Sequence, residues 1–129
     1  MHDKIRTVNT QSAPKAIGPY SQAVIANGFL FVSGQLPLDA SSGEFVQEGI
    51  EERARTILQN IQAIAQSVGS DLKHAVKMKI FLTDIQNFAK VNEVYASFFN
   101  QHLPARTAMQ VAALPKNADI EMEAIILVP

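Results

Sequence analysis

The last strand-like segment, residues 120–128, constrains the possible folds more than any other part of the chain. Its residues alternate between two faces, and the face that begins with Ile120 is apolar along its whole length. The opposite face reads Glu121, Glu123, Ile125 and Leu127, so its second half is apolar as well. A sheet with one face in water normally carries polar residues on that face. We therefore expect both faces of this strand to be covered.

Two segments have the three-and-four spacing of an amphipathic helix. Residues 50–68 place their apolar side chains on one continuous stripe, and Gly69 follows where a left-handed terminator belongs. A second stripe runs over residues 85–99, and Asp84 precedes it as a candidate N-cap. These patterns predict two helices that each bury one side.

The other periodic segments alternate with the period of a strand, and Asn27-Gly28 between two of them predicts a two-residue hairpin. The predicted strands are residues 4–8, 21–26, 29–33, 76–83, 106–112 and 119–128. The resulting order β-β-β-α-β-α-β-β is a single α+β domain, residues 1–129, with a mixed sheet and both helices on one sheet face. The first helix connects two strands by a crossover, which predicts that those strands pair in parallel.

Length and composition exclude several classes of protein. A chain of 129 residues has the size of one domain, and the lack of cysteine removes disulfides, zinc–thiolate sites and thiol nucleophiles. A net charge of −1 gives no global attraction for nucleic acid or an anionic membrane. The three histidines have no metal-ligand spacing, and no P-loop or nucleotide-binding fingerprint is present. The longest apolar run is residues 124–128 and the N-terminus has no apolar stretch, which predicts a cytoplasmic protein without a membrane segment.

The second apolar face of the last strand needs a cover that this chain cannot supply. The remaining segments are too small to cover it, and identical chains are the commonest partners. We therefore expect a homo-oligomer, with Glu121 close to a subunit boundary.

Several polar residues have both an ordinary and a functional interpretation. Arg106 at a strand start is typical of a surface charge, but its guanidinium also suits the carboxylate of an α-keto or α-imino acid. If the last two strands are neighbours, Arg106 and Glu121 could approach one site. Ser33-Gly34 fits a turn or a ligand-binding loop. The basic cluster around Lys77 and Lys79 is typical of a solvent-facing strand edge and only weakly suggests RNA binding.

Short segments spread over nearly the whole chain resemble one known family. They are residues 16–23 (AIGPYSQA), 31–35 (FVSGQ), 91–99 (VNEVYASFF), 104–106 (PAR), 114–116 (LPK) and 120–124 (IEMEA). Together, in this order, they resemble the RidA (YjgF) family of reactive-intermediate deaminases, also called 2-iminobutanoate/2-iminopropanoate deaminases.

The resemblance implies a chorismate-mutase-like fold assembled as a homotrimer, with ligand sites in clefts between subunits. It also implies hydrolysis of the enamine and imine intermediates that pyridoxal-phosphate enzymes such as threonine dehydratase release. The products are a 2-oxo acid and ammonia, and no cofactor or metal is needed.

Carried over residue by residue, the resemblance makes Arg106 the anchor of the substrate carboxylate and Glu121 the group that holds and polarises the attacking water. Gly34 offers its backbone N–H beside the ligand, with Ser33 adjacent. Tyr20 and Asn92 match positions that line the cleft. A guanidinium near Glu121 would favour the ionised carboxylate.

The chain departs from the family directly after the arginine, where many members have Ser then Cys. Thr107 keeps the hydroxyl and adds a methyl, and Ala108 lacks the thiol. We keep both residues as predicted substrate-binding positions, and the lack of a thiol excludes thiol-based regulation.

Two other functions remain open. The chain could be a non-catalytic binder of small carboxylates, or an endoribonuclease or translation inhibitor, which its near-neutral charge disfavours.

Overall fold

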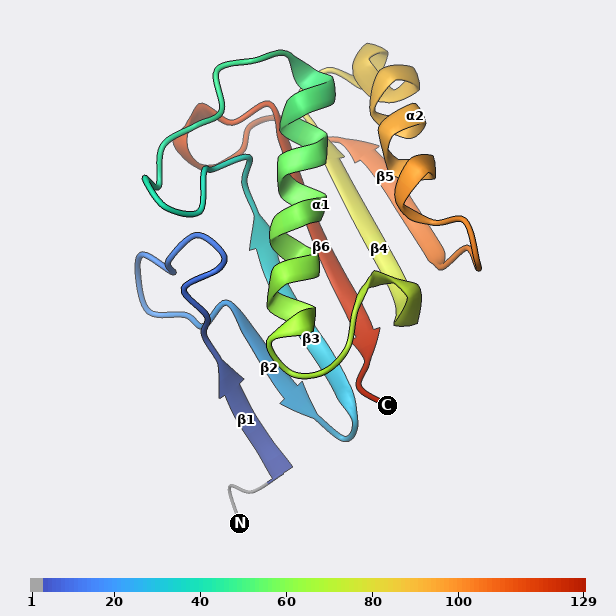
Figure 1. The fold of residues 1–129 in the computed structure, drawn as a ribbon. Coiled ribbons are helices and arrows are strands. Elements are labelled where there is room, and N and C mark those ends of the chain that lie inside the picture. The colour runs from blue at the N-terminus through green and yellow to red at the C-terminus, as the bar shows by residue number, and fades with distance from the viewer. Residues whose placement is uncertain (1–3) are drawn as a thin grey trace.

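The computed structural model describes residues 4–129, which form a six-stranded mixed sheet with two α-helices packed on one face (Figure 1). The strands are β1 (Ile5–Val8), β2 (Ala23–Ala26), β3 (Phe29–Gln35), β4 (Ala75–Leu82), β5 (Ala105–Gln110) and β6 (Ile120–Leu127), and the helices are α1 (Ile50–Gln66) and α2 (Phe88–Phe98). The predicted α+β class and element order are confirmed. Residues 1–3 lie outside the described residues. They include His2 and the start of the N-terminal segment that lacks an apolar stretch.

Local signals in the sequence correspond to local structure. Asn27 and Gly28 have φ angles of 55° and 83°, as a type I′ hairpin turn requires. Gly69 follows α1 with a φ of 81°. The Asp84 carboxylate accepts a 3.0 Å hydrogen bond from the Gln86 N–H, but it caps a short 3₁₀ turn (Ile85–Asn87). As a result, α2 begins three residues later than its apolar stripe predicts.

The strand order in the sheet is β1-β2-β3-β6-β4-β5, and this order corrects one prediction. The strands joined through α1, β3 and β4, are not paired with each other because β6 lies between them and is antiparallel to both. The parallel neighbours are instead β4 and β5, which are joined through α2. Because β6 is apolar on one face and half apolar on the other, a central position buries more of its surface than an edge would.

The sheet interior also corrects the interpretation of the β4 residues. Lys77 and Lys79 do not mark a strand edge, since β4 pairs with β6 on one side and β5 on the other. Their ammonium groups instead contact neighbouring strands, at 3.0 Å from Thr107 Oγ1 and 3.5 Å from Glu123 Oε1. Alternation along β4 would place Val76 on the same face as the buried Met78, but Val76 is 43% exposed, because a register shift between Ala75 and Lys77 interrupts the alternation.

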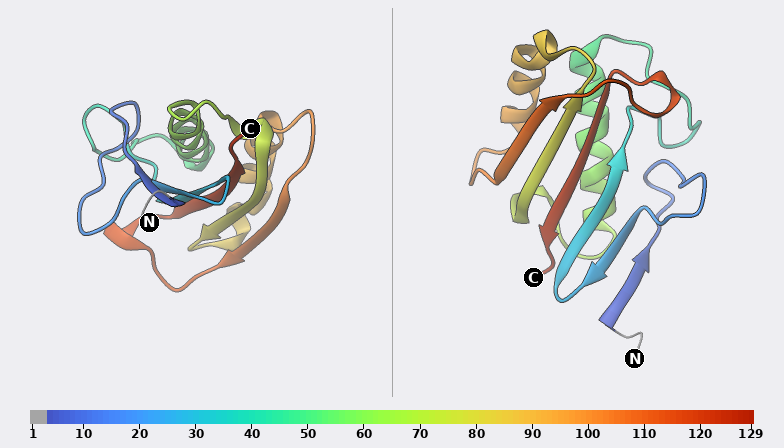
Figure 2. Two further views of the ribbon diagram at one scale, coloured as in Figure 1. Left: turned by 90° about the horizontal axis from the view of Figure 1, so that it is seen from below. Right: turned by 180° about the vertical axis from the view of Figure 1, so that it is seen from behind.

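The two faces of the sheet differ in what covers them. Side chains of β6 that point toward α1 are buried, among them Ile120, Met122 and Ile126, each fully inaccessible. The other side, here called the open face, has no helix or strand of residues 4–129 over it (Figure 2). Phe31 and Leu127 on the open face are 44% and 42% exposed. The predicted second apolar face is therefore present, and its cover is absent from the described part of the chain.

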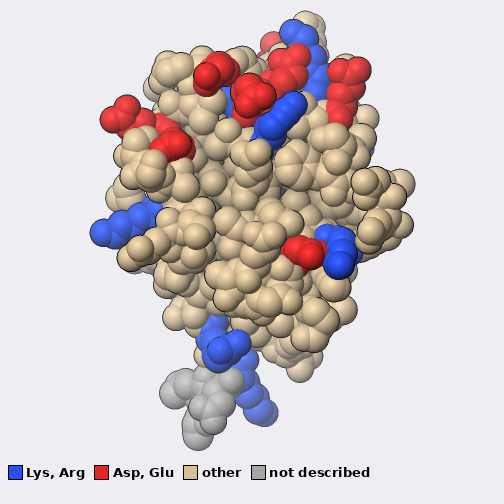
Figure 3. Space-filling view, in the orientation of Figure 1, with Lys and Arg blue, Asp and Glu red and all other residues tan. Residues whose placement is uncertain are grey.

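The helix side of the molecule shows an uneven distribution of charge. Acidic and basic side chains gather toward the end where α1 begins, whereas the centre of this surface is largely uncharged (Figure 3).

Over residues 4–129 neither helix combines the length and the hydropathy that a membrane crossing would need.

The core beneath α1 predicts a specific sensitivity to truncation. Ile61 of α1 is fully buried, so Ile61→Ala should lower the free energy of unfolding by about 2–5 kcal/mol through lost burial and a residual cavity. Urea denaturation measures the change. Gln66→Ala, at an exposed position of the same helix, serves as the control and should change stability by less than about 0.5 kcal/mol. Equal effects of the two substitutions would contradict this description of the core.

Candidate functional site

A cavity of about 550 Å³ opens at one end of the sheet and gathers four of the eight predicted site residues. Tyr20 comes from the loop before β2, Ser33 and Gly34 come from the end of β3, and Glu121 comes from the start of β6. The turn before β6 contributes Lys116 to the rim. Residues distant in sequence therefore meet here because β3 and β6 are neighbours in the sheet.

Gly34 and Glu121 approach each other so closely that any side chain at position 34 would displace the Glu121 carboxylate from its observed position. A Cβ atom at Gly34 would lie 2.5 Å from Glu121 Oε2 and 2.8 Å from its Cδ. The pairing of β3 with β6 shifts register between Val32 and Gln35, which interrupts the regular ladder at Ser33 and Gly34. The glycine therefore lets the Glu121 carboxylate lie directly against the backbone of β3.

The buried side chain of Gln22 fixes the loop that carries Tyr20. Its carbonyl oxygen accepts from the Thr10 N–H at 2.7 Å, and its amide group donates to the Pro14 carbonyl at 2.9 Å. Ser33 joins the same loop, since its hydroxyl donates to the Ser21 carbonyl at 2.7 Å. The Tyr20 side chain remains 52% exposed at the cavity. This network holds one wall of the cavity while leaving the aromatic ring accessible.

Glu121 is half-buried, and its surroundings disfavour its charge. Burial raises the pKa of the Glu121 carboxyl above its ordinary value, and the negative charge of Glu123 raises it further. The family resemblance implied an arginine near Glu121 that would favour the ionised form. Within one chain no such effect reaches Glu121, because Arg106 lies elsewhere. A carboxyl with a raised pKa holds its proton more readily than an exposed one, which suits a group that exchanges a proton with a bound molecule.

Arg106 belongs to a second cluster, here called the arginine platform, formed with Phe88, Asn92 and Tyr95 of α2. The guanidinium carbon lies 5.1 Å from the Phe88 ring centroid and 4.9 Å from that of Tyr95. Its Nη1 donates a 2.7 Å hydrogen bond to Asn92 Oδ1. Cation–π contacts and one hydrogen bond fix the plane of an exposed arginine whose remaining donors are free to bind an anion. Burial raises the pKa of Tyr95, and the charge of Arg106 opposes that rise.

The two positions after the arginine point to opposite sides of the sheet. Ala108 lies on the helix side with Arg106 and packs against the hydrophobic core. Thr107 lies on the open face, where its hydroxyl accepts from Lys77 Nζ at 3.0 Å. Ala108 is therefore next to the arginine platform, whereas Thr107 is separated from it by the thickness of the sheet.

Arg106 and Glu121 do not meet within one chain. From sequence, the two residues could approach one site if the last two strands were neighbours. The structure shows that they are not, because β4 lies between β5 and β6. Arg106 is in register with the buried Met78 on the helix side, and Glu121 is in register with Phe81 on the open face. The predicted site is thus divided into two surfaces, the cavity with Tyr20, Ser33, Gly34 and Glu121, and the arginine platform with Arg106 and Asn92, beside which Ala108 lies.

Sequence reasoning missed several residues that shape these surfaces. The apolar stripe of the second helix includes Phe88 and Tyr95, and both pack in or against the core as that stripe predicts. Their spacing with Asn92 (i, i+4, i+7) also places all three on one helix face, where they contact Arg106. Arg53 had no sequence signal at all. It donates to the Val46 carbonyl at 3.0 Å and pairs with Asp119 at 3.1 Å, so it ties the loop after β3 to the turn before β6 beside the cavity.

The donor set of the cavity is suited to a small organic ligand. Among residues 4–129 no group of three or more His, Cys, Asp or Glu side chains is arranged to hold a metal ion. The cavity offers a carboxyl, a phenol and backbone groups, and the platform offers a guanidinium. The guanidinium of the platform is suited to bind a carboxylate, and the carboxyl of the cavity is suited to acid–base chemistry, but one chain holds them on separate surfaces.

Comparisons with known proteins agree with the fold and the quoted motifs. Residues 10–128 match the family described as Endoribonuclease L-PSP. The human protein named 2-iminobutanoate/2-iminopropanoate deaminase is 45% identical over 122 residues, which cover 95% of this chain and 89% of the human one. The crystal structure of Escherichia coli TdcF with bound serine superposes with a TM-score of 0.89 at 41% identity, covering 95% and 98% of the two chains. That of RidA from an Antarctic Psychrobacter gives 0.91 at 40% identity, covering 95% and 99%.

The electrostatics of the cavity predict a measurable effect of its second carboxylate. Glu123→Gln removes the like charge beside Glu121, so the pKa of the Glu121 carboxyl should fall toward its ordinary value. Carbon-13 NMR of labelled glutamate side chains, followed against pH, measures the shift. Glu93→Gln, on the exposed side of α2, should leave the titration of Glu121 unchanged. An unchanged or raised Glu121 pKa in Glu123→Gln would contradict the assigned cause.

Proposed function

The chain belongs to the Endoribonuclease L-PSP family, also known as the YjgF/RidA family, and from that premise we propose that it hydrolyses reactive 2-imino acids to 2-oxo acids and ammonia. The proposed substrates are 2-iminobutanoate and 2-iminopropanoate, together with their enamine tautomers, and the proposed location is the cytoplasm. Several relatives that are 45–47% identical over most of the chain carry the name of this deaminase, which is an enzyme.

The arginine platform supports this proposal most directly. A 2-imino acid has a carboxylate beside the reacting carbon, and Arg106 presents an exposed guanidinium whose orientation is fixed by Phe88, Tyr95 and Asn92. A guanidinium held in one plane can form two parallel hydrogen bonds to a carboxylate. Such an anchor sets the position of the neighbouring imine carbon without contacting it.

The chemistry then needs a placed water and a group that moves one proton. Water adds to the iminium carbon, and Glu121 accepts the proton that the water loses, giving a carbinolamine. Glu121 then transfers that proton to the amino nitrogen of the carbinolamine. The C–N bond breaks, ammonia leaves, and the hydroxyl oxygen becomes the carbonyl oxygen of the 2-oxo acid. The hydroxyl proton goes to solvent or to the released ammonia. A carboxyl whose pKa burial has raised can serve in both directions. An iminium carbon is already electrophilic, so orientation supplies most of the acceleration.

Assembly of identical chains would bring the two surfaces together. Arg106 and Glu121 lie on opposite sides of one sheet, so one protomer cannot offer both to one small molecule. The open face carries exposed apolar side chains such as Phe31 and Leu127, which a second copy would bury. We propose a homotrimer in which the platform of one subunit closes the cavity of the next.

Two rival functions give different results in the same assay. A non-catalytic carboxylate binder would use the platform without increasing ammonia release from the imine. An endoribonuclease, the activity that the family description names, would cleave RNA and would likewise leave ammonia release unchanged. Threonine dehydratase coupled to ammonia detection, with the uncatalysed rate subtracted, distinguishes the deaminase from both.

Removal of the anchor should abolish the proposed reaction. Arg106→Ala should lower imine hydrolysis above the uncatalysed rate by about a hundredfold or more, because the substrate loses the contact that orients it. Size-exclusion chromatography should show an unchanged oligomer. Arg6→Ala, an exposed arginine of β1, is the matched control and should retain full activity. Full activity of Arg106→Ala would remove the mechanism.

A mixture of two inactive variants should recover activity if each site is built from two chains. Arg106→Ala and Glu121→Gln chains, unfolded and refolded together in equal amounts, should give about a quarter of sites with both groups intact in a cyclic assembly. The ammonia assay on the mixture, against each variant refolded alone, measures the recovery. Activity no higher than that of the separate variants would show that the two groups do not act across a subunit boundary.

A further inference from the structure

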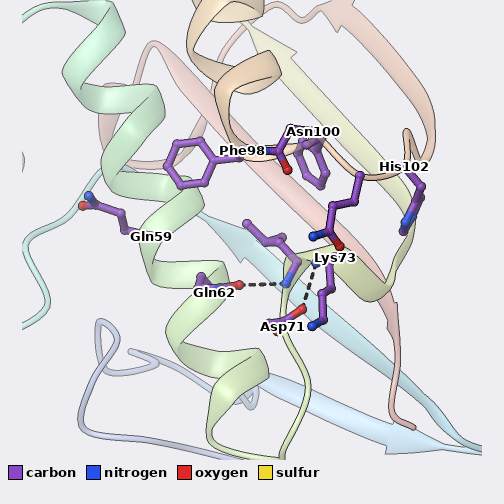
Figure 4. A pocket seen from close by; sticks show the side chains of 10 residues that line it. Gln59, Gln62, Asp71, Lys73, Phe98, Asn100 and His102 are labelled. Atoms are coloured by element: carbon purple, nitrogen blue, oxygen red, sulfur yellow. Dashed lines mark hydrogen bonds between the residues drawn. The ribbon is translucent and has the colours of Figure 1, made fainter.

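A second cavity, of about 430 Å³, lies on the helix side of the molecule, away from Glu121 and the open face. It is formed by α1, the short 3₁₀ turn η2 (Leu72–His74) and the residues that follow α2 (Figure 4). Neither Arg106 nor any other residue of the proposed deaminase site lines it. The mechanism above therefore leaves this cavity without a role.

The cavity combines apolar walls with carboxamides. Phe98 and the buried residues Leu72 and Phe99 supply the apolar surface. Gln62 uses its carbonyl oxygen to accept from the Leu72 N–H at 2.7 Å, which leaves its amide hydrogens for a bound molecule. Asn100 points into the same space from the opposite wall (Figure 4). The surroundings would hold an apolar group on one side and a polar head on the other.

One negative and one positive side chain line this cavity without pairing with each other. Asp71 caps η2 by accepting from the Lys73 N–H at 3.0 Å, and its second carboxylate oxygen remains available. Within residues 4–129, neither Asp71 nor Lys73 forms an ion pair at 4.0 Å or less. Both side chains come from the same short turn and lie side by side at one end of the cavity, whereas Phe98 and Asn100 lie at its other end (Figure 4).

These observations select the class of ligand. A simple anion would be attracted by Lys73 and repelled by Asp71, and a simple cation would meet the reverse. A zwitterion satisfies both groups, and the apolar wall at Phe98 adds burial of a hydrocarbon side chain. We propose that this cavity is a second ligand site, which binds the zwitterion of an apolar α-amino acid with its ammonium at Asp71 and its carboxylate at Lys73.

The test measures binding in a protein whose proposed carboxylate anchor is absent. Isothermal titration of the full-length Arg106→Ala variant with L-leucine should show saturable binding. Adding Lys73→Met, or Asp71→Asn, which preserves the cap, should weaken that binding by about tenfold or more. Lys90→Met on α2 is the matched control and should leave it unchanged. Because Arg106 is already missing, failure of the proposed deaminase function would not alter this result.

Two analogues of L-leucine test whether binding needs both the ammonium and the carboxylate. 4-Methylpentanoate lacks the ammonium, and 3-methylbutylamine lacks the carboxylate, so both should bind more weakly than L-leucine. Saturable binding of L-leucine that responds to both Lys73→Met and Asp71→Asn would support the proposal. The absence of saturable binding, an equal response to Lys90→Met, or equally tight binding of either analogue would overturn it.

Discussion

The packing of β6 beneath α1 is the contact on which the other features of the molecule depend. Three β6 side chains, Ile120, Met122 and Ile126, are fully buried on that side, and each such side chain stabilises the fold by about 1.5–3 kcal/mol relative to exposure. Since residues alternate along a strand, this burial forces Glu121 and Glu123 to the other side. The position of the acidic pair is thus a consequence of the core, and the cavity forms where β3 bends past it.

The same alternation explains why the two halves of the proposed site are separated. Arg106 follows the helix side of β5, where α2 supplies aromatic rings, and Glu121 follows the open face of β6. A single chain therefore holds an anion-binding group and a proton-exchanging group that have no means of reaching the same small molecule. Each half has its own support within one chain, since α2 holds the platform, and Gln22 and Gly34 shape the cavity.

Local features of the fold could be predicted from sequence because each is decided by a few adjacent residues. The hairpin at Asn27-Gly28 is of this kind, and so is the capping role of Asp84, although the element that Asp84 caps is the 3₁₀ turn before α2. The order of the strands is not, since it depends on which strand gains most from a central position, and the pattern of 120–128 indicated burial without indicating neighbours. The bulges at Val76 and near Gly34 likewise depend on pairing partners, so alternation in one strand could not reveal them. Of the site, the residue types were accessible, whereas the aromatic support of Arg106 and the bridging role of Arg53 required the tertiary structure.

The turn before β6 bears on how firmly the cavity rim is held. Lys116 and Asn117 have φ angles of 58° and 57°; asparagine tolerates this left-handed conformation, whereas lysine adopts it at an energetic cost of about 1–2 kcal/mol. Local preference thus works against the observed shape, and the salt bridge from Arg53 to Asp119 lies within three residues of the turn. Loss of the Arg53–Asp119 salt bridge would therefore let Lys116 leave its strained conformation, which would change the mouth of the cavity without altering the sheet.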